Sequence, residues 1–213
     1  MKLKQTVKCT ATLYCKTGLR IGGTKDSLDI GASNPIVRHP LTRVPYIPGS
    51  SIKGKLRSLL ESVHSSNNTE RACACGTCPV CKYFGSLNSA SPTRLLVRDA
   101  FITADHLSTL QHANEDFGIN FVETKTENMI NRKNGKAEKP RSIERIPAGT
   151  EFEVELIIRV FEGDDPSESQ ALLEQGIRMM EADYLGGSGG RGYGQVEFRN
   201  LTFTPITWDE KRS

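Results

Sequence analysis

The sequence predicts a single α+β domain in which helices alternate with strands. Residues 6–14 and, most cleanly, 151–161 alternate apolar and polar side chains with the period of a half-buried strand. Residues 52–63 and 167–184 instead repeat apolar side chains at the spacing of an amphipathic helix. With 37% hydrophobic residues, a chain of 213 residues can bury one core of this kind.

In chain order we expect strand, helix, strand, strand, helix and strand, which is the order of a ferredoxin-like split βαβ core. The two remaining strands, at 94–102 and 194–203, rest on shorter apolar runs. Several connections are long, and loops of that length inside a compact domain tend to carry function. We therefore expect one domain, 1–213, with insertions at 15–49, 64–93 and 104–147.

The first helix begins in an unusual stretch, "IPGSSIKGKLRSLLE" at residues 47–61. It places Lys53, Lys55 and Arg57 in the first two turns, where carboxylates are normally favoured. Gly54 falls on the outward side, where the missing side chain lets another backbone approach. Cations gathered at a helix start indicate a polyanionic ligand.

The second helix carries its own boundary signals. Ser167 and Gln170 predict a capping box at its start. Gly186 and Gly187 predict its end.

The bulk composition excludes few functions. The net charge of +3, from 28 cationic and 25 acidic side chains, does not identify a partner, because nucleic-acid binding shows in how cations are placed. The sequence opens without a signal peptide's apolar core and has no run long enough to cross a bilayer. We therefore expect a cytoplasmic protein with no membrane partner, whose cysteines are free thiols or metal ligands. Cys9 and Cys15, at strand positions, are expected in the core.

The stretch "CACGTCPVC" places Cys73, Cys75, Cys78 and Cys81 within nine residues. Overlapping C-x2-C pairs let thiolates converge on one tetrahedral ion, and a site closed by thiolates favours a structural zinc. Because ligands this close strain a mononuclear site, His64 is an alternative to Cys73 as the fourth ligand. An iron–sulfur cluster and a chance grouping of buried thiols are the other interpretations.

A glycine-rich stretch, "YLGGSGGRGYGQVEF" at 184–198, surrounds Arg191. Such a loop can bring backbone N–H groups, including those of Gly189 and Gly190, against phosphates, and Arg191 adds a bidentate donor. The Walker A order is missing, so nucleotide hydrolysis is not indicated. A flexible turn before the last strand is the alternative interpretation. A second glycine-rich stretch, at 17–26, carries Arg20.

The insertion around 119–152 is rich in cations, among them Arg132 and Arg141. Its centre, "NRKNGKAEKPR", predicts an extended hairpin with Asn134 and Gly135 at the tip. On its own such a charge run is equally typical of a solvated loop. Next to the cationic helix start and the glycine loops, it favours a nucleic-acid ligand.

Four blocks taken together resemble one family. In chain order they read "TGLRIGG", "NPIVRHPLTRVPYIPGSSIKGKLRSLLE", "ETKTENMINRKNGKAEKPRSIERIPAGTEF" and "LGGSGGRGYGQVEF". The chain is similar to the repeat-associated (RAMP) superfamily, specifically to the repeating backbone subunit of type III-A CRISPR effector (Csm) complexes. That resemblance implies a modified RNA-recognition-motif fold whose copies stack into a filament along a guide RNA (crRNA).

The resemblance also implies roles for individual residues and partners. Contacts to the guide backbone would come from Arg20, Lys53, Lys55, Arg57, Gly189, Gly190 and Arg191. Residues 119–145, within the 104–147 insertion, would be the family's thumb, a hairpin that crosses the guide–target duplex, with Met129 and Ile130 as a wedge and Arg132 and Arg141 as further RNA contacts. Implied partners are crRNA, complementary target RNA, other copies of the chain and the other subunits of a type III effector complex in antiviral defence.

One departure from the family concerns cleavage. Members that cut target RNA carry an aspartate shortly before the "PIVR" block, where it acts in metal-dependent cleavage. Here the stretch reads "DIGASNPIVRHP", with Ser33 at that position between Ala32 and Asn34. A hydroxyl does not hold Mg²⁺ as a carboxylate does. We expect an inactive subunit, natural or engineered, unless Asp29 or Asp26 substitutes; Mg²⁺ or another divalent ion is expected only then.

Two other functions stay open on the sequence. A metal-dependent endoribonuclease acting on target RNA or on CRISPR repeat RNA would need a base and an acid beside the scissile phosphate. The 4 histidines lie in no clear context of that kind. A zinc-dependent DNA-binding module would need a recognition helix after the cysteines, and none is indicated.

Overall fold

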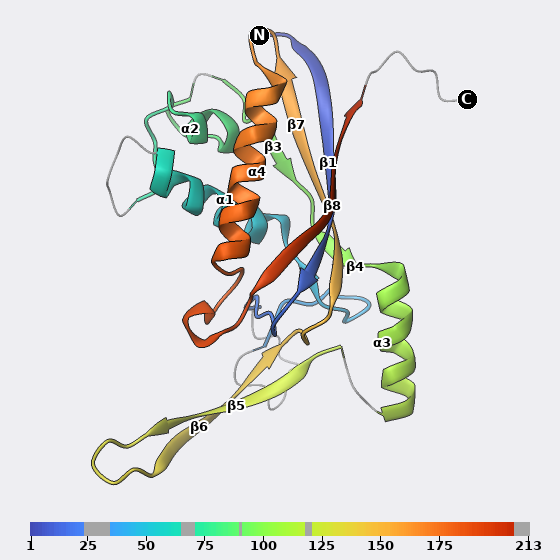
Figure 1. Ribbon diagram of the computed structural model, residues 1–213, viewed down its shortest axis with the longest axis vertical. Helices are drawn as coiled ribbons and strands as arrows, with labels where there is room; N and C mark the ends of the chain where they lie inside the picture. The colour runs from blue at the N-terminus through green and yellow to red at the C-terminus, as the bar shows by residue number, and fades with distance from the viewer. Residues whose placement is uncertain (24–34, 65–70, 90, 118–120, 207–213) are drawn as a thin grey trace.

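The structure is a computed structural model that describes residues 1–23, 35–64, 71–89, 91–117 and 121–206. Its centre is an antiparallel sheet in the order β2-β4-β7-β1-β8, with β3 also paired to β7 (Figure 1). The strands are β1 (Leu3–Cys15), β2 (Tyr46–Ile47), β3 (Leu95–Val97), β4 (Ala100–Ile102), β7 (Glu151–Phe161) and β8 (Val196–Ile206).

The two most regular sequence alternations form the middle of this sheet. β1 lies between β7 and β8, with Cys9 opposite Leu156 on one side and Phe203 on the other. Cys9, Leu13 and Cys15 are fully buried, as expected for core thiols and aliphatic side chains on one face of a strand. The intervening side chains, such as Thr12, are only partly buried and face away from this core.

Helices cover that face of the sheet. α1 (Gly49–His64) and α4 (Pro166–Ala182) pack against each other over the sheet, and the short α2 (Pro79–Phe84) lies beside α1 (Figure 1). The fully buried Ile52, Leu56 and Leu60 form the stripe of α1 that enters the core. A further helix, α3 (Ala104–Phe117), extends away from the end of β4. Among the described residues, no helix combines the length and apolar character that crossing a membrane requires.

The order of elements and strands confirms the predicted ferredoxin-like α+β core. Two local predictions are wrong. The strand expected at 94–102 divides into β3 and β4, which pair with β7 in registers that differ by one residue. Between them, the Asp99 carboxylate accepts a hydrogen bond from Gly49 N at 2.7 Å. The capping box at Ser167 is absent: Asp165 is the N-cap of α4, its side chain accepts from Ser167 N, and the helix ends at Ala182, before the glycines.

The long middle insertion forms a hairpin with its own two-stranded sheet, β5 (Glu123–Ile130) and β6 (Ala137–Arg145), which projects from the body (Figure 1). Asn134 and Gly135 lie in the turn at its tip, where Gly135 has a φ of 69°. The predicted hairpin is therefore confirmed. The glycine-rich stretch before β8 folds into a loop that contains one short 3-10 turn, η1 (Gly189–Arg191).

Candidate nucleic-acid interface and metal centre

The start of α1 is built around a carboxylate from another part of the chain. The first turn of α1 holds no acidic residue. Asp99 supplies one instead, through its bond to Gly49 N. A Cβ at Gly49 would collide with the carbonyl of Val97, so this approach requires glycine. The Asp99 carboxylate, between β3 and β4, thus compensates the partial positive charge at the N-terminus of α1.

Lys53 and Arg57 point along α1 toward the body. Lys53 Nζ donates to Leu95 O at 3.2 Å, and burial, with the charges of Arg57 and Arg159, lowers the pKa of this lysine. Arg57 pairs with Glu61 at 2.8 Å and donates from Nη2 to Cys73 O at 2.8 Å. Arg57 therefore holds the cysteine loop against the helix.

Lys55 lies where α1 meets the glycine loop. Its ammonium is 2.6 Å from the Asp183 carboxylate and 3.8 Å from the centre of the Tyr184 ring. A Cβ at Gly189 would collide with that ring, so Gly189 has a packing role. Lys55 is thereby held at a fixed point beside the loop.

The glycine loop itself leaves room at its surface. A Cβ at Gly190 or Gly192 would meet no described atom within 4 Å, and the same is true of Gly54 on α1. The loop is tied down by Gly187 N, which donates to Arg20 O at 2.8 Å. Within the described part of the chain, Arg20 Nε is buried without a hydrogen-bond partner. The N–H groups of Gly187, Arg191 and Gly192 already donate within the protein. What the loop offers an approaching ligand is therefore the open space at Gly190.

The root of the hairpin meets the same loop. Glu127 of β5 accepts hydrogen bonds from Arg191 Nη1 and from Tyr193 Oη, each at 2.8 Å. Tyr193 is almost fully buried, and Lys125 and Arg145 lie over its ring at 4.8 Å from the centre. These contacts could not be predicted from the sequence, because the partners lie far apart along the chain.

The outer part of the hairpin carries the remaining predicted residues. Met129 and Ile130 are 54% and 67% exposed. As consecutive strand residues they project from opposite faces of the ribbon. Arg132 and Arg141 are exposed as well. All four side chains are therefore exposed on the hairpin.

The sheet face away from α1 and α4 is less suited to RNA. RNA-recognition motifs stack bases on aromatic side chains of this face. Here the outward rows of β1 and β7 carry Glu153 and a Lys8–Glu155 ion pair at 2.8 Å. The ring of Tyr14 is covered by the Arg199 guanidinium, 3.7 Å from its centre. This face therefore lacks uncovered aromatic rings at Tyr14 on which a base could stack.

The predicted cleavage residues, Ser33 and Asp29, lie outside the described residues, as does Asp26. The chain on either side of them is paired, with Gly23 N donating to Pro35 O at 3.1 Å and Val37 N to Ile21 O at 2.9 Å.

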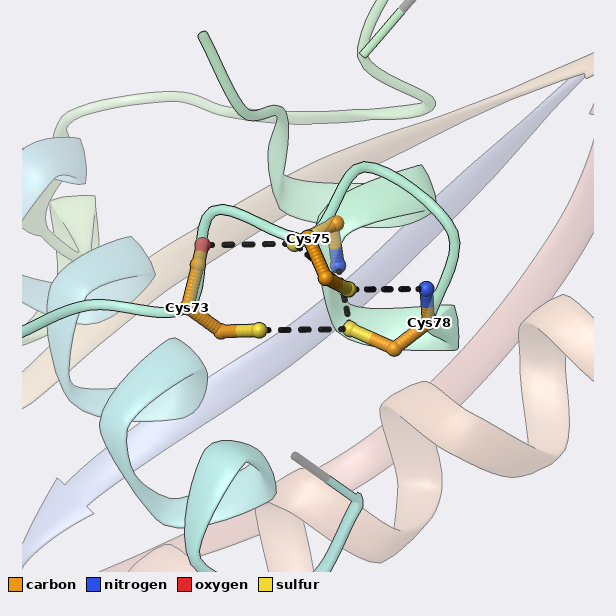
Figure 2. Close-up of side chains that lie close together, drawn as sticks. Cys73, Cys75 and Cys78 are labelled. Carbon is orange, nitrogen blue, oxygen red and sulfur yellow. Dashed lines mark hydrogen bonds between the residues drawn. The ribbon is translucent and has the colours of Figure 1, made fainter. Parts of the chain in front are cut away.

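The cysteine cluster forms a compact thiol site between α1 and α2. All four Sγ atoms lie within 4.8 Å of one another, and Cys73–Cys78 and Cys75–Cys81 are each 3.8 Å apart. Figure 2 shows how Cys73, Cys75 and Cys78 lie together. A tetrahedral ion with metal–sulfur bonds of about 2.3 Å spaces its sulfurs about 3.8 Å apart. The thiols therefore fit one metal ion. His64 is not part of the group, because its Nε2 is 2.8 Å from Gln175 Oε1 on α4.

Local hydrogen bonds prepare one of these thiols for a cation. Backbone N–H of Cys78, together with Thr77, lowers the pKa of Cys75 to about 5. Burial raises the pKa of Cys78 to about 12, so a bound cation is needed to ionise it. Cys78 also caps α2 by accepting from Cys81 N.

The fold and these surfaces define a ferredoxin-like α+β protein with a glycine-rich loop, a projecting hairpin and a four-cysteine site that fits a metal ion. The chain belongs to the RAMP superfamily, whose family model matches residues 12–197. The predicted superfamily is therefore confirmed.

Among the relatives is a protein from Methanothermobacter thermautotrophicus named CRISPR system Cms endoribonuclease Csm3, 42% identical over 217 residues that cover 94% of this chain and 86% of that protein. A protein of the same name from Streptococcus thermophilus is 37% identical over 210 residues, with 94% and 90% covered.

Two solved structures also contain chains that are similar to this one. A chain from the crystal structure of the Csm3-Csm4 subcomplex in the type III-A CRISPR-Cas interference complex matches with a TM-score of 0.62 and 27% identity, covering 96% of this chain and 81% of that one. A chain from the type III-B Cmr-beta complex bound to cognate target RNA matches with a TM-score of 0.66 at 18% identity, covering 93% and 61%; it supports the fold alone.

Proposed function

We propose that this chain is a guide-RNA-binding backbone subunit, repeated along the crRNA of a type III CRISPR complex that recognises target RNA. One observation carries the proposal. Contacts link the start of α1, the glycine loop and the hairpin, since Lys55 lies over Tyr184 and Arg191 pairs with Glu127. In the same region Gly54 and Gly190 have open space where a side chain would be. Such a surface suits a sugar–phosphate chain.

The protein would recognise the RNA by its sugar–phosphate backbone. Guide RNA supplies sequence through base pairing, so the protein needs phosphate contacts more than base contacts. Gly54 and Gly190 let the RNA chain come close, and Lys55 and Arg191 supply charge. Arg20, whose carbonyl oxygen accepts from Gly187 N, would contribute its side chain beside the loop. Lys53 and Arg57 would add charge at the helix start, while each also donates to a carbonyl oxygen of the chain.

The hairpin would cross the guide–target duplex. Because Met129 and Ile130 project from opposite faces of the ribbon, one of the two meets a given base step and the other faces the neighbouring step or copy. Arg132 and Arg141 would contact phosphates of the duplex. Target RNA, further copies of the chain and the other complex subunits are the partners this arrangement requires.

The metal would be a structural zinc. A site of four thiolates has no open position for substrate, and the sulfur spacing suits one tetrahedral ion better than an iron–sulfur cluster, which separates its thiolates more widely. When bound, zinc would stabilise the loop that Arg57 and Glu61 dock on α1, where Glu61 accepts from Cys73 N at 3.0 Å. Cysteines that bind a metal and form no disulfide suit the reducing cytoplasm, which we propose as the compartment.

We propose that this chain binds target RNA without cutting it. Relatives are named endoribonucleases, but the segment before "PIVR" carries Ala32, Ser33 and Asn34 in place of a carboxylate. Asp29 is the alternative ligand for a divalent ion. Its replacement by alanine, in the assembled complex with Mg²⁺ and labelled target RNA, separates the two cases, since only a catalytic Asp29 would give regular cuts that Asp29→Ala abolishes.

The binding proposal is tested by the salt dependence of RNA affinity. Each phosphate contact to single-stranded RNA contributes about 0.7 to the slope of log K against log salt concentration. Lys55→Ala and Arg191→Ala should each lower the affinity and flatten the slope by about that amount. Lys8→Ala removes the same charge from the open sheet face and should leave the slope unchanged. Equal effects of all three variants would contradict the proposed path.

A further inference from the structure

Glu127 joins two parts of the proposed RNA surface that are distant in sequence. Its Oε2 accepts from Arg191 Nη1 of the glycine loop and its Oε1 from Tyr193 Oη, both at 2.8 Å. The Glu127 side chain is 14% exposed, whereas that of Arg191 is 51% exposed. One edge of the guanidinium is therefore held while the rest faces outward.

We propose that Glu127 is a positioning residue for RNA: it fixes the exposed guanidinium of Arg191 and holds the hairpin at a set angle to the glycine loop. The inference rests on the proposed function, since it assumes that Arg191 meets phosphate. The RNA then encounters the glycine loop and the hairpin as one prearranged surface. Prearranged groups bind more tightly, because less conformational freedom is lost on binding.

The support behind Glu127 is rigid. Tyr193, which donates to it, is 1% exposed, and Lys125 and Arg145 enclose its ring. The Tyr193 hydroxyl, aided by the charges of Arg191, Lys125 and Arg141, lowers the pKa of the Glu127 carboxyl. Arg145 in turn packs where a Cβ at Gly18 would collide with it. The carboxylate is thus charged and held from behind.

The position of this carboxylate is otherwise unfavourable for RNA. A negative charge next to a phosphate path repels the ligand. Simple electrostatics therefore predicts that neutralising Glu127 strengthens RNA binding, whereas the positioning role predicts that binding weakens. In Glu127→Gln the amide oxygen can face Arg191 only if the amide N–H₂ turns to the Tyr193 hydroxyl oxygen. In either orientation the charge-assisted bond to the guanidinium is lost, so Arg191 is held less firmly. The two accounts therefore predict opposite changes in RNA affinity for Glu127→Gln.

The test measures binding of a fluorescent single-stranded RNA to the full chain over a range of salt concentrations. Glu127→Gln should weaken binding by about three- to tenfold and flatten the salt slope by about 0.7, the loss of one phosphate contact. Glu138→Gln is the matched control: it neutralises an exposed carboxylate of the same hairpin, bonded to Asn131 at 2.8 Å. It should leave binding unchanged or strengthen it.

Repeating the measurement in the Arg191→Ala variant distinguishes a positioning role of Glu127 from a role in folding. With Arg191→Ala already present, Glu127→Gln should no longer weaken binding, because the group it positions is gone. Tighter or unchanged binding by Glu127→Gln alone would overturn the inference while leaving the proposed function intact. Equal weakening in both backgrounds would also overturn it, since Glu127 would then act on the fold. Failure of the unaltered chain to bind RNA would remove the proposed function and the inference together.

Discussion

Replacing Gly54 by alanine should move stability and RNA affinity in opposite directions. Gly54 lies inside the 16-residue α1, is exposed, and a Cβ there would meet no described atom within 4 Å. Alanine in a helix interior is favoured over glycine by about 0.5–1 kcal/mol. For a chain of this size, the melting temperature should rise by about 1–4 °C.

RNA affinity should fall, because the added methyl group occupies the space that we assign to the approaching RNA backbone. If the displaced RNA backbone loses one hydrogen bond to the protein, worth about 1 kcal/mol, the Kd should become roughly fivefold weaker. The assays are thermal unfolding and fluorescence anisotropy with single-stranded RNA.

Ser62→Ala serves as the control for Gly54→Ala. It changes an exposed residue two turns further along the same helix, away from the proposed path. A more stable Gly54→Ala variant with unchanged RNA affinity would refute the reasoning, since it would show that no RNA backbone passes close to Gly54.

Three further predictions concern the glycine loop, the metal and cleavage. Gly189→Ala should lower both stability, by about 1–3 kcal/mol, and RNA affinity, because its Cβ meets the Tyr184 ring; Gly190→Ala, which meets nothing described, should lower affinity alone. Elemental analysis should find about one zinc per chain, and a strong chelator should lower the melting temperature; a chelator without effect would contradict a structural ion. Ser33→Asp should give the assembled complex evenly spaced, Mg²⁺-dependent cuts in target RNA, and uncut RNA would show that more than this carboxylate is missing.

The elements that follow a regular period could be predicted from the sequence. β1, β7 and the stripe of α1 bury one face each, so their periodicity reports the core directly. The cysteine site could be predicted for a related reason, since its ligands are close along the chain and local spacing sets their geometry.

Contacts between distant segments could not be predicted. The bond from Gly49 N to Asp99, between β3 and β4, joins segments 50 residues apart. The N-cap of α4 is different, because Asp165 reaches Ser167 N locally and the Asp165-Pro166 pair is itself a signal of a helix start. Glu127 looked like one charge in a charged insertion, and only the fold brings it to Arg191 and Tyr193. Likewise, the cations of α1 looked alike in sequence, yet Arg57 holds the cysteine loop while Lys55 lies beside the glycine loop.

The path of the RNA is the central claim, and photo-cross-linking tests it most directly. The full chain, purified on its guide RNA, is irradiated and the cross-linked peptides are identified by mass spectrometry. We expect cross-links in the first turns of α1, in residues 184–194 and in the hairpin. Cross-links concentrated on the open face of β1, β7 and β8 would contradict the account, because the RNA would then lie across the sheet as in an ordinary RNA-recognition motif.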